Sequence, residues 1–372
     1  MIDAVEAGEG VLTLRWAGGR TSRFPYLWLR DNCACPRCRD PRNGQRLFDV
    51  LDLPADPRPA SVALQDGDVA VSWTGENHAS RYAGAWLAAH DPAPEARRAR
   101  RQQRRHWGAE IANDLPQADW PRLLADPSEE HRLLQALADH GFAILHQVPK
   151  EPGQVAVVGD RLGYVRATNY GRIFDVLSVP NPNNLANTAL ALGVHTDNPY
   201  RDPTPGLQLL HCLEAGAPGG DTLLVDGFRA AEALRQRHPE DFARLSQLPL
   251  PFHFADGKAD LKASTPVISV DFEGRVTAVH YNNRSMAPLD LPEAEILPWY
   301  RAYRRFAAIL REPAGELRIR LEPGNLLIME NNRALHGRTA FDPSRGRRHL
   351  QGCYVDKDGV ESRRRVLERS VA

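Results

Sequence analysis

Short stretches of alternating apolar and polar residues characterise the N-terminal part of the chain. Val11–Trp16 and Val69–Trp73 both follow the period of two that is typical of a half-buried β-strand. Glycine, proline and aspartate residues, which favour turns, surround both stretches. We therefore predict a small β-rich domain over residues 1–92, and we find no internal repeat along the chain.

A helical pattern lies near the start of the segment after residue 107 and gives way to strands. Asp126 begins a helix-capping pattern, leucines then recur at helical spacing, and Gly141 ends the helix before a buried strand at Phe142–Leu145. Further strand-length apolar runs, separated by turns, lie at Gly206–Leu213, Thr222–Val225, Val267–Val270, Val276–Tyr281 and Asn325–Met329. These runs predict a β-sandwich or barrel over residues 107–372.

Two helices are expected to interrupt this β core, at Ala230–Leu245 and near Leu297–Leu310. In the second, aromatic and leucine side chains recur at helical spacing, which indicates core packing. The predicted fold class is therefore mainly β with helical insertions (α+β).

Residues 93–106 break the β pattern with prolines and then with a run of arginines, so we place a basic linker there. A basic run can bind phosphate groups, but Lys+Arg and Asp+Glu are equal at 47 each, so the whole chain has no net charge to attract nucleic acid. We interpret the run as a solvated linker and expect no nucleic-acid partner.

No apolar run approaches the roughly 20 residues that a membrane-spanning helix needs. The first residues are acidic, unlike those of a secretory signal peptide. We expect a cytoplasmic protein with no membrane partner.

A candidate iron site combines two distant segments. His195 and Asp197 are two residues apart, so in an extended segment both side chains would point to the same face. His336 is the best third ligand, because two histidines and one carboxylate form the facial triad that leaves positions on Fe(II) open for a co-substrate and oxygen. His-x-Asp alone is a weak signal, and a turn-capping aspartate beside a surface histidine is the alternative.

The segment after His336 adds a second signal. Arg348 follows twelve residues later, and a guanidinium can pair bidentately with the distal carboxylate of 2-oxoglutarate. Arg345 or Arg347 could serve instead, or Arg348 could form a surface salt bridge. Thr222, at the start of a predicted strand, offers a hydroxyl to the same carboxylate.

Three of the five cysteines, Cys33, Cys35 and Cys38, lie within six residues. Five cysteines are too few for a disulfide scaffold in a chain of 372 residues, so this spacing favours a metal site.

In combination, these motifs resemble the γ-butyrobetaine and trimethyllysine dioxygenase branch of the taurine-dioxygenase-like superfamily over nearly the whole chain. The motifs that carry the resemblance are Leu29–Cys38, Asn181–Asn187, His195–Asp197, His336–Arg338 and Arg348–Tyr354. The resemblance implies a double-stranded β-helix (jelly-roll) catalytic domain, iron at His195, Asp197 and His336, and 2-oxoglutarate at Arg348. It also implies hydroxylation of a trimethylammonium substrate, a homodimer, and ascorbate as a reductant.

The same resemblance interprets the cysteine cluster. It implies a structural zinc ion held by Cys33, Cys35, Cys38 and His78, and His90 is the alternative fourth ligand. Three thiolates and an imidazole form a closed tetrahedral site, which stabilises folding and does not catalyse.

For the substrate, the resemblance implies an aromatic cage, because a quaternary ammonium group donates no hydrogen bond and is held by aromatic faces. Tyr170, Phe174 and Tyr354 match cage positions. Asn187 and Asn198 replace two tyrosines of the animal enzyme, and Tyr200 could compensate.

The anionic end of the substrate would contact a different set of side chains. Amide donors for a carboxylate are offered by Asn184, Asn282 and Asn283, whereas Arg284 could pair with a phosphonate. We expect γ-butyrobetaine to become L-carnitine, with release of succinate and CO2. Trimethyllysine and a trimethylammonio-alkylphosphonate are the alternative substrates, and a non-catalytic protein that binds zinc and nucleic acid is a remote alternative.

Overall fold

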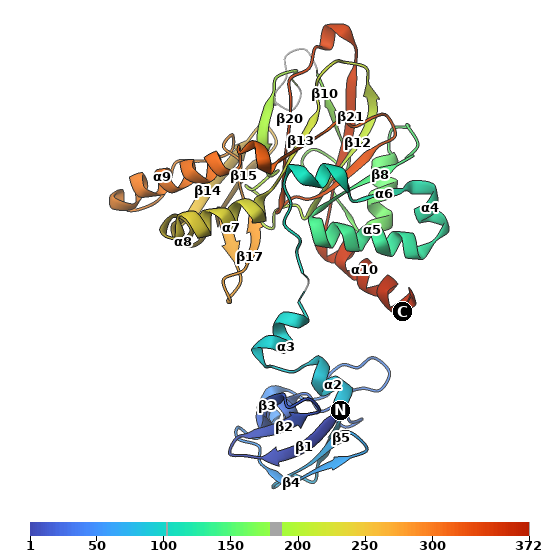
Figure 1. The fold of residues 1–372 in the computed structure, drawn as a ribbon, viewed down its shortest axis with the longest axis vertical. Coiled ribbons are helices and arrows are strands. Elements are labelled where there is room, and N and C mark those ends of the chain that lie inside the picture. Colours follow the sequence, from blue (N-terminus) through green and yellow to red (C-terminus); the bar gives the residue numbers. More distant parts are fainter. Residues whose placement is uncertain (102, 179–187, 372) are drawn as a thin grey trace. The chain divides into compact units, whose positions relative to one another are not determined.

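The computed structural model describes residues 1–101, 103–178 and 188–371 (Figure 1). Contacts divide the chain into two compact units, Met1–Gln102 and Gln103–Ala372. No helix in the described parts of the chain is long and apolar enough to cross a membrane.

The first unit contains two small antiparallel sheets, each followed by a short helix. The first half comprises β1 Ile2–Ala7, β2 Val11–Trp16, β3 Thr21–Pro25 and α1 Tyr26–Asp31; the second comprises β4 Pro59–Gln65, β5 Asp68–Trp73, β6 Ala79–Tyr82 and α2 Gly84–Ala89. A 3₁₀ turn at Val50–Asp52 precedes β4, and α3 Pro94–Ala99 ends the unit.

The two halves of this unit repeat one packing arrangement. In each central strand every second residue is buried, and a buried tryptophan donates to a serine hydroxyl: Trp16 to Ser22 at 2.6 Å and Trp73 to Ser80 at 2.9 Å. The two halves thus share a packing arrangement. Their loops differ in length, and in the sequence only the alternating apolar positions and the Trp/Ser pair match.

Two facing sheets form the centre of the second unit. The larger sheet has the order β10 Phe174–Leu177, β21 Arg348–Val355, β12 Leu207–Ala215, β19 Leu326–Glu330, β8 Phe142–His146, β7 Gln117–Asp119, with β9 Val165–Arg166 paired to β21. The smaller sheet has the order β11 Leu192–His195, β20 Ala334–Arg338, β13 Thr222–Asp226, β18 Glu316–Ile319. Side chains from both sheets, such as Leu210, Leu327 and Leu224, pack into one core. This arrangement confirms the predicted jelly-roll fold.

Helices cover the outer face of the larger sheet: α4 Trp120–Ala125, α5 Pro127–His140, α6 Gln154–Leu162 and α10 Lys357–Val371. β12 is buried on both faces because Leu209 packs toward these helices and Leu210 toward the smaller sheet. Asp126 caps α5 by accepting from the Ser128 N–H, and Gly141 ends it in the left-handed region at φ 79°. Both helix ends therefore lie where the sequence predicts them.

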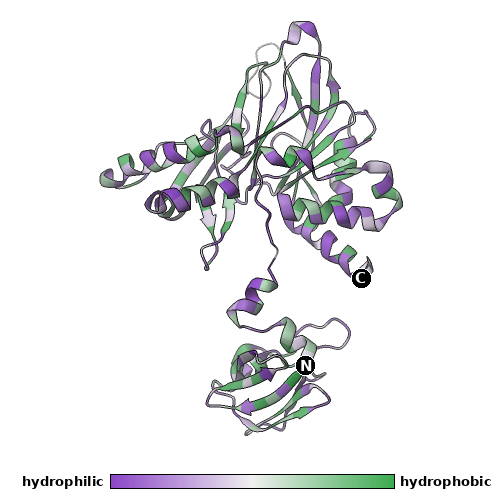
Figure 2. Cartoon of the chain, viewed as in Figure 1, coloured by the Kyte–Doolittle hydropathy of each residue, from purple (hydrophilic) through white to green (hydrophobic). Residues whose placement is uncertain are grey.

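The insertion between β13 and β18 forms a lobe on the side of the unit opposite to α4, α5 and α6 (Figure 1). It consists of α7 Gly227–Arg237, α8 Pro239–Gln247, the hairpins β14 Pro249–Ala255 with β15 Asp260–Pro266 and β16 Ile268–Val270 with β17 Val276–Val279, and α9 Glu293–Ile309. Figure 2 shows polar and apolar residues alternating along α8 and α9, as expected for helices that bury one face. The prediction of one helix over Ala230–Leu245 was wrong, because the backbone of His238 is not helical and Pro239 begins a new helix.

Candidate active site and metal cluster

Pairing of β11 with β20 brings the three candidate iron ligands together. His195 lies opposite His336 in the register, and their ring centroids are 4.4 Å apart. His195 Nε2 lies 3.3 Å from Asp197 Oδ1, and the ligand atoms of all three residues lie within 4.8 Å of one another. Asp197 lies in a bend just beyond the end of β11, so the two side chains converge although the segment is not extended throughout.

The hydrogen bonds of His195 prepare its ring for metal binding. Its Nδ1 lies 2.9 Å from the Gly193 carbonyl oxygen, which can only accept, so Nδ1 carries the proton. Nε2 is then left with its lone pair toward Asp197 and His336. A backbone carbonyl that fixes the tautomer in this way is common for histidine ligands of metals.

The carboxylate of Asp197 is held through one oxygen only. Tyr354 Oη and Gln208 Nε2 both donate to Oδ2, at 2.8 Å and 2.7 Å, so Oδ1 remains available to a metal. Burial would raise the pKa of Asp197, but the neighbouring His336 and His195 and the hydrogen bond from Tyr354 outweigh burial and hold this pKa well below its ordinary value. Asp197 is thus ionised at neutral pH.

His336 is neutral at the same pH. Burial lowers its pKa to about 3, and the neighbouring His195 and Arg284 contribute in the same direction. Two imidazoles and one carboxylate on one side of a buried site are the donor set that suits Fe(II). The residues therefore fit the implied iron ion.

Arg348 is the first residue of β21 and is 8% exposed. Its Nε donates to the Gly220 carbonyl at 3.1 Å, and its guanidinium carbon lies 5.7 Å from the centre of the Phe341 ring. A side chain at Gly220 would collide with the Arg348 side chain at 2.7 Å, so glycine at 220 leaves the room that the guanidinium fills. In the described parts of the chain, no carboxylate lies within ion-pair distance of Arg348.

The alternatives to Arg348 lie in exposed positions. Arg347 is 66% exposed at its side chain and pairs with Glu214 at 3.3 Å, and Arg345 is exposed in a 3₁₀ turn at Pro343–Arg345. Thr222 is buried on β13, where its register partner on β20 is Arg338. The structure therefore singles out Arg348 as the buried arginine of this segment.

Aromatic rings gather next to Asp197. Tyr170 and Tyr200 share a hydrogen bond of 2.9 Å between their hydroxyl groups, and the Tyr200 hydroxyl donates to Asn198 Oδ1 at 2.5 Å. Phe254 stacks on Tyr200 at 5.1 Å. Phe174 lies on the opposite strand β10 and packs at 5.1 Å from Tyr354.

Three site residues were missed by sequence reasoning. Phe254 completes the ring cluster from the β14–β15 hairpin, Gln208 binds the Asp197 carboxylate, and Asn331 binds the backbone of Asp197. The alternation of Phe252 and Phe254 along β14 was a signal, but it does not indicate which face reaches the site. Gln208 interrupts an apolar strand, and a buried glutamine in such a strand is a usable signal for a bound polar group.

The candidate amides for the anionic end of the substrate lie in different environments. Asn282 is buried, and its Nδ2 donates to the Thr196 carbonyl at 2.9 Å, so it helps to hold the segment between the first two ligands. Asn283 and Arg284 are exposed. Asn184 and Asn187 lie outside the described residues.

The cysteine cluster of the first unit contains His78. Its Nε2 lies 3.3 Å from Cys33 Sγ, 3.8 Å from Cys35 Sγ and 3.6 Å from Cys38 Sγ. His90 is exposed and stacks on Trp86 at 4.4 Å. Three thiols and one imidazole within reach of one ion fit a structural zinc site.

Two family models and several relatives match the chain. The model of the taurine catabolism dioxygenase TauD, TfdA family matches residues 99–354, and the model of the gamma-butyrobetaine hydroxylase-like N-terminal domain matches residues 4–109. A gamma-butyrobetaine dioxygenase of Pseudomonas sp. (strain AK-1) is 39% identical and aligns with 99% of this chain and 96% of its own length. A trimethyllysine dioxygenase of Meyerozyma guilliermondii is 32% identical, with 97% of this chain and 94% of its own length covered.

Solved structures agree with the fold. AAD-2 in complex with Mn(II) and N-oxalylglycine has a TM-score of 0.52 at 15% identity and covers 70% of this chain and 99% of its own. An asparagine oxygenase in complex with Fe(II), 2S,3S-3-hydroxyasparagine and succinate has a TM-score of 0.50 at 19% identity, covering 62% and 80%. The chain therefore belongs to the taurine catabolism dioxygenase TauD, TfdA family, with a gamma-butyrobetaine hydroxylase-like N-terminal domain, and is a dioxygenase dependent on iron and 2-oxoglutarate.

Proposed function

We propose that this protein hydroxylates a small molecule with a trimethylammonium group at one end and an anion at the other, and that γ-butyrobetaine, converted to L-carnitine, is the substrate. The observation that carries this proposal is the cluster of aromatic rings beside Asp197. Tyr170, Tyr200 and Phe254 are linked to one another, and Tyr354 contacts the carboxylate directly. Aromatic faces are the chemistry that holds a quaternary ammonium group.

The relatives support the same substrate class. Gamma-butyrobetaine dioxygenases and trimethyllysine dioxygenases are similar to this chain over almost its full length, and the names of both describe substrates with a trimethylammonium group.

Each group of site residues has a distinct task in this proposal. Iron bound at the triad supplies the oxidation, in which 2-oxoglutarate and oxygen become succinate and CO2 while a substrate C–H becomes C–OH. Arg348 binds and orients the distal carboxylate of 2-oxoglutarate, and Thr222 lies two residues after Gly220, whose carbonyl accepts from Arg348. The rings hold the substrate cation so that its target C–H lies near the triad, and burial of the site excludes water.

The anionic end of the substrate separates γ-butyrobetaine from its rivals. Arg284 is exposed close to the triad, and its charge contributes to the low pKa of His336 after burial and His195. A guanidinium in this position suits a carboxylate or a phosphonate, whereas trimethyllysine would also bring a second ammonium group toward it. This charge is the specific observation that keeps a trimethylammonio-alkylphosphonate as the second candidate.

The decisive experiment compares substrates by two signals, succinate release and hydroxylated product. Iron-loaded protein receives γ-butyrobetaine, trimethyllysine or 2-(trimethylammonio)ethylphosphonate, and a fourth reaction receives 5,5-dimethylhexanoate, in which carbon replaces the nitrogen of γ-butyrobetaine. A desolvated cation–π contact contributes about 2 kcal/mol, so the neutral compound should have a KM higher by about tenfold or more. Equal KM values for the charged and neutral compounds would contradict recognition by the rings. Hydroxylated product from the phosphonate alone would contradict the assignment of γ-butyrobetaine as the substrate.

We further propose that the protein is a cytoplasmic homodimer, as the resemblance of its motifs to the dioxygenase branch implies. Sedimentation velocity of the full chain tests the dimer, which requires a single species of about twice the 41.4 kDa chain mass. A monomer at concentrations above those of the activity assay would contradict it.

A further inference from the structure

The turn between β19 and β20 contacts the iron ligand Asp197 through one buried amide. Asn331, 1% exposed, accepts from the backbone N–H of Asp197 at 2.7 Å and donates to the backbone carbonyl of Asp197 at 2.9 Å. The same Nδ2 also donates to the carbonyl of Pro205 at 3.0 Å. One side chain thus satisfies both backbone groups of a ligand that lies in a bend, where no strand partner can do so.

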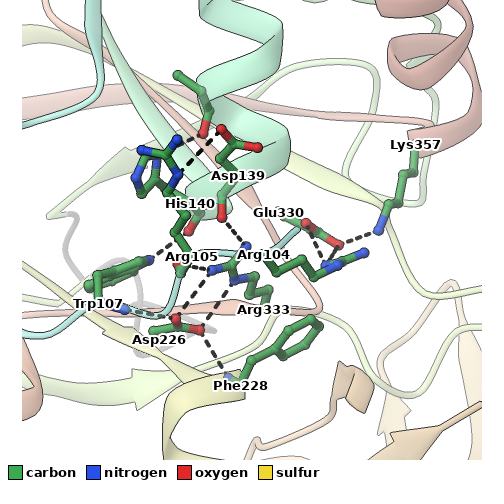
Figure 3. Close-up of polar contacts among 11 residues, drawn as sticks. Arg104, Arg105, Trp107, Asp139, His140, Asp226, Phe228, Glu330, Arg333 and Lys357 are labelled. Atoms are coloured by element: carbon green, nitrogen blue, oxygen red, sulfur yellow. Dashed lines mark hydrogen bonds and ion pairs between the residues drawn. The ribbon is translucent and has the colours of Figure 1, made fainter. Parts of the chain in front are cut away.

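Two buried charged residues of this turn, Glu330 before Asn331 and Arg333 after it, form ion pairs, which Figure 3 shows. Glu330, 5% exposed, pairs with Arg104 at 3.3 Å and with Lys357. Arg333 is fully buried and pairs with Asp226 at 3.3 Å.

Arg333 also binds main-chain oxygens from two other segments. It donates to the carbonyls of Asp139 at 2.8 Å and Arg105 at 2.6 Å. Trp107 reinforces this group, because its backbone N–H donates to Asp226 at 3.2 Å and its indole to His140 at 2.6 Å. Figure 3 shows these side chains converging on the turn from separate segments.

The turn also leads directly into the strand of another ligand. β20 begins at Ala334 and carries His336, whose register partner on β11 is His195. The backbone of the turn is fixed to neighbouring strands, because Glu330 N–H donates to Gly141 at 2.7 Å and Asn331 N–H donates to Gly206 at 3.0 Å. A displacement of the turn would therefore move Asp197 through Asn331 and His336 through β20.

We propose that Asn331 is a positioning residue of the iron site: its amide fixes the backbone of Asp197 relative to His336, and the ion pairs of Glu330 and Arg333 hold the turn that carries it. This inference rests on the iron site of the proposed function and is independent of the substrate. Residues that orient metal ligands typically contribute about tenfold to hundredfold in metal affinity or activity.

The test compares Asn331→Ala with Asn332→Ala. Asn332 is the adjacent residue of the same turn; its side chain accepts from Thr204 at 3.2 Å and is half-buried. Binding of Mn(II) to the full chain is measured by the loss of the electron paramagnetic resonance signal of free Mn(II), with circular dichroism and thermal unfolding as controls of folding. The coupling of succinate release to hydroxylated product is measured separately with iron.

Asn331→Ala is expected to weaken Mn(II) binding by about tenfold or more and to raise the amount of succinate formed per hydroxylated product, whereas Asn332→Ala should match the wild type. If Asn331→Ala does not fold, the isosteric Asn331→Asp removes both donated bonds, retains the acceptor and should still uncouple the reaction. Wild-type affinity and wild-type coupling in a folded Asn331 variant would overturn the proposal. A wild-type protein that binds Mn(II) but hydroxylates no trimethylammonium compound would contradict only the proposed substrate class.

Discussion

Replacement of Arg348 by methionine should separate co-substrate binding from folding. The guanidinium is buried and donates through Nε to Gly220, while no carboxylate lies within ion-pair distance of it in the described parts of the chain. Methionine can occupy the buried space with a side chain of similar length. Two charge-assisted hydrogen bonds to a carboxylate contribute about 1.5–3 kcal/mol each, so their loss should raise the Kd for 2-oxoglutarate by about 10² to 10⁴.

The same change should have a small effect on stability. The variant loses one charge-assisted hydrogen bond to a carbonyl, but it also removes a buried charge that has no acidic partner, and these effects oppose each other. We therefore expect the free energy of unfolding to change by less than about 2 kcal/mol.

The assay is a calorimetric titration of the Mn(II)-loaded protein with 2-oxoglutarate. The matched control is Arg347→Met. Arg347 is 66% exposed and pairs with Glu214 on the surface, so its loss should leave the Kd unchanged. A Kd for Arg348→Met within about threefold of the wild type would refute the assigned role, because even one lost charge-assisted bond predicts about tenfold. An equally large effect of Arg347→Met would transfer the role to the exposed arginine.

Three further predictions concern stability. A chelator strong enough to remove zinc from Cys33, Cys35, Cys38 and His78 should unfold residues 1–102 and leave the jelly roll folded, which proteolysis followed by mass spectrometry can show. Burial alone would raise the pKa of Glu130, but the hydrogen bonds from Arg363 and Arg161 outweigh burial and lower this pKa. The ionised Glu130 therefore stabilises the fold fully above the unfolded-state pKa of about 4.3, and this stabilisation is lost as the pH falls through the folded-state pKa. Urea unfolding between about pH 3 and pH 6 should accordingly show a smaller acid-induced loss for Glu130→Gln than for the wild type. Arg333→Met should cost about 3–5 kcal/mol because it leaves Asp226 buried without its cation, and the added change Asp226→Asn should restore part of this loss; equal stability of the single and double variants would contradict the argument.

Most elements that short-range patterns predicted are present in the structure. Val11–Trp16 coincides with β2, and the helix from Asp126 to Gly141 begins and ends as its capping residues indicate. The error at Ala230–Leu245 came from giving the apolar periodicity more weight than Pro239, which is favoured in the first turn of a helix and disfavoured in its interior. Local rules thus succeed where neighbouring residues alone determine the conformation.

The iron ligands could be proposed from the sequence because their residue types are rare in combination. Cys33, Cys35 and Cys38 could be proposed as metal ligands because their spacing is rare. The residues that hold the iron ligands in place could not be identified from the sequence. Gln208 and Asn331 are ordinary amides, and they act on Asp197 only because β12 and the turn after β19 pass beside it in the folded chain. Their roles depend on tertiary contacts that no local pattern encodes.

The basic run of residues 93–106 is a second case in which tertiary contacts, and not local composition, decide the role of the residues. Composition favoured a solvated linker over residues 93–106, but Arg104 pairs with Glu330, and Arg105 offers its carbonyl to Arg333. Since Glu330 and Arg333 flank Asn331, residues that precede the jelly roll in sequence contribute to holding an iron ligand more than 90 residues away. A charge run at a domain boundary can therefore belong to the core of the following domain, and buried acidic partners such as Glu330 distinguish that case from a solvated linker.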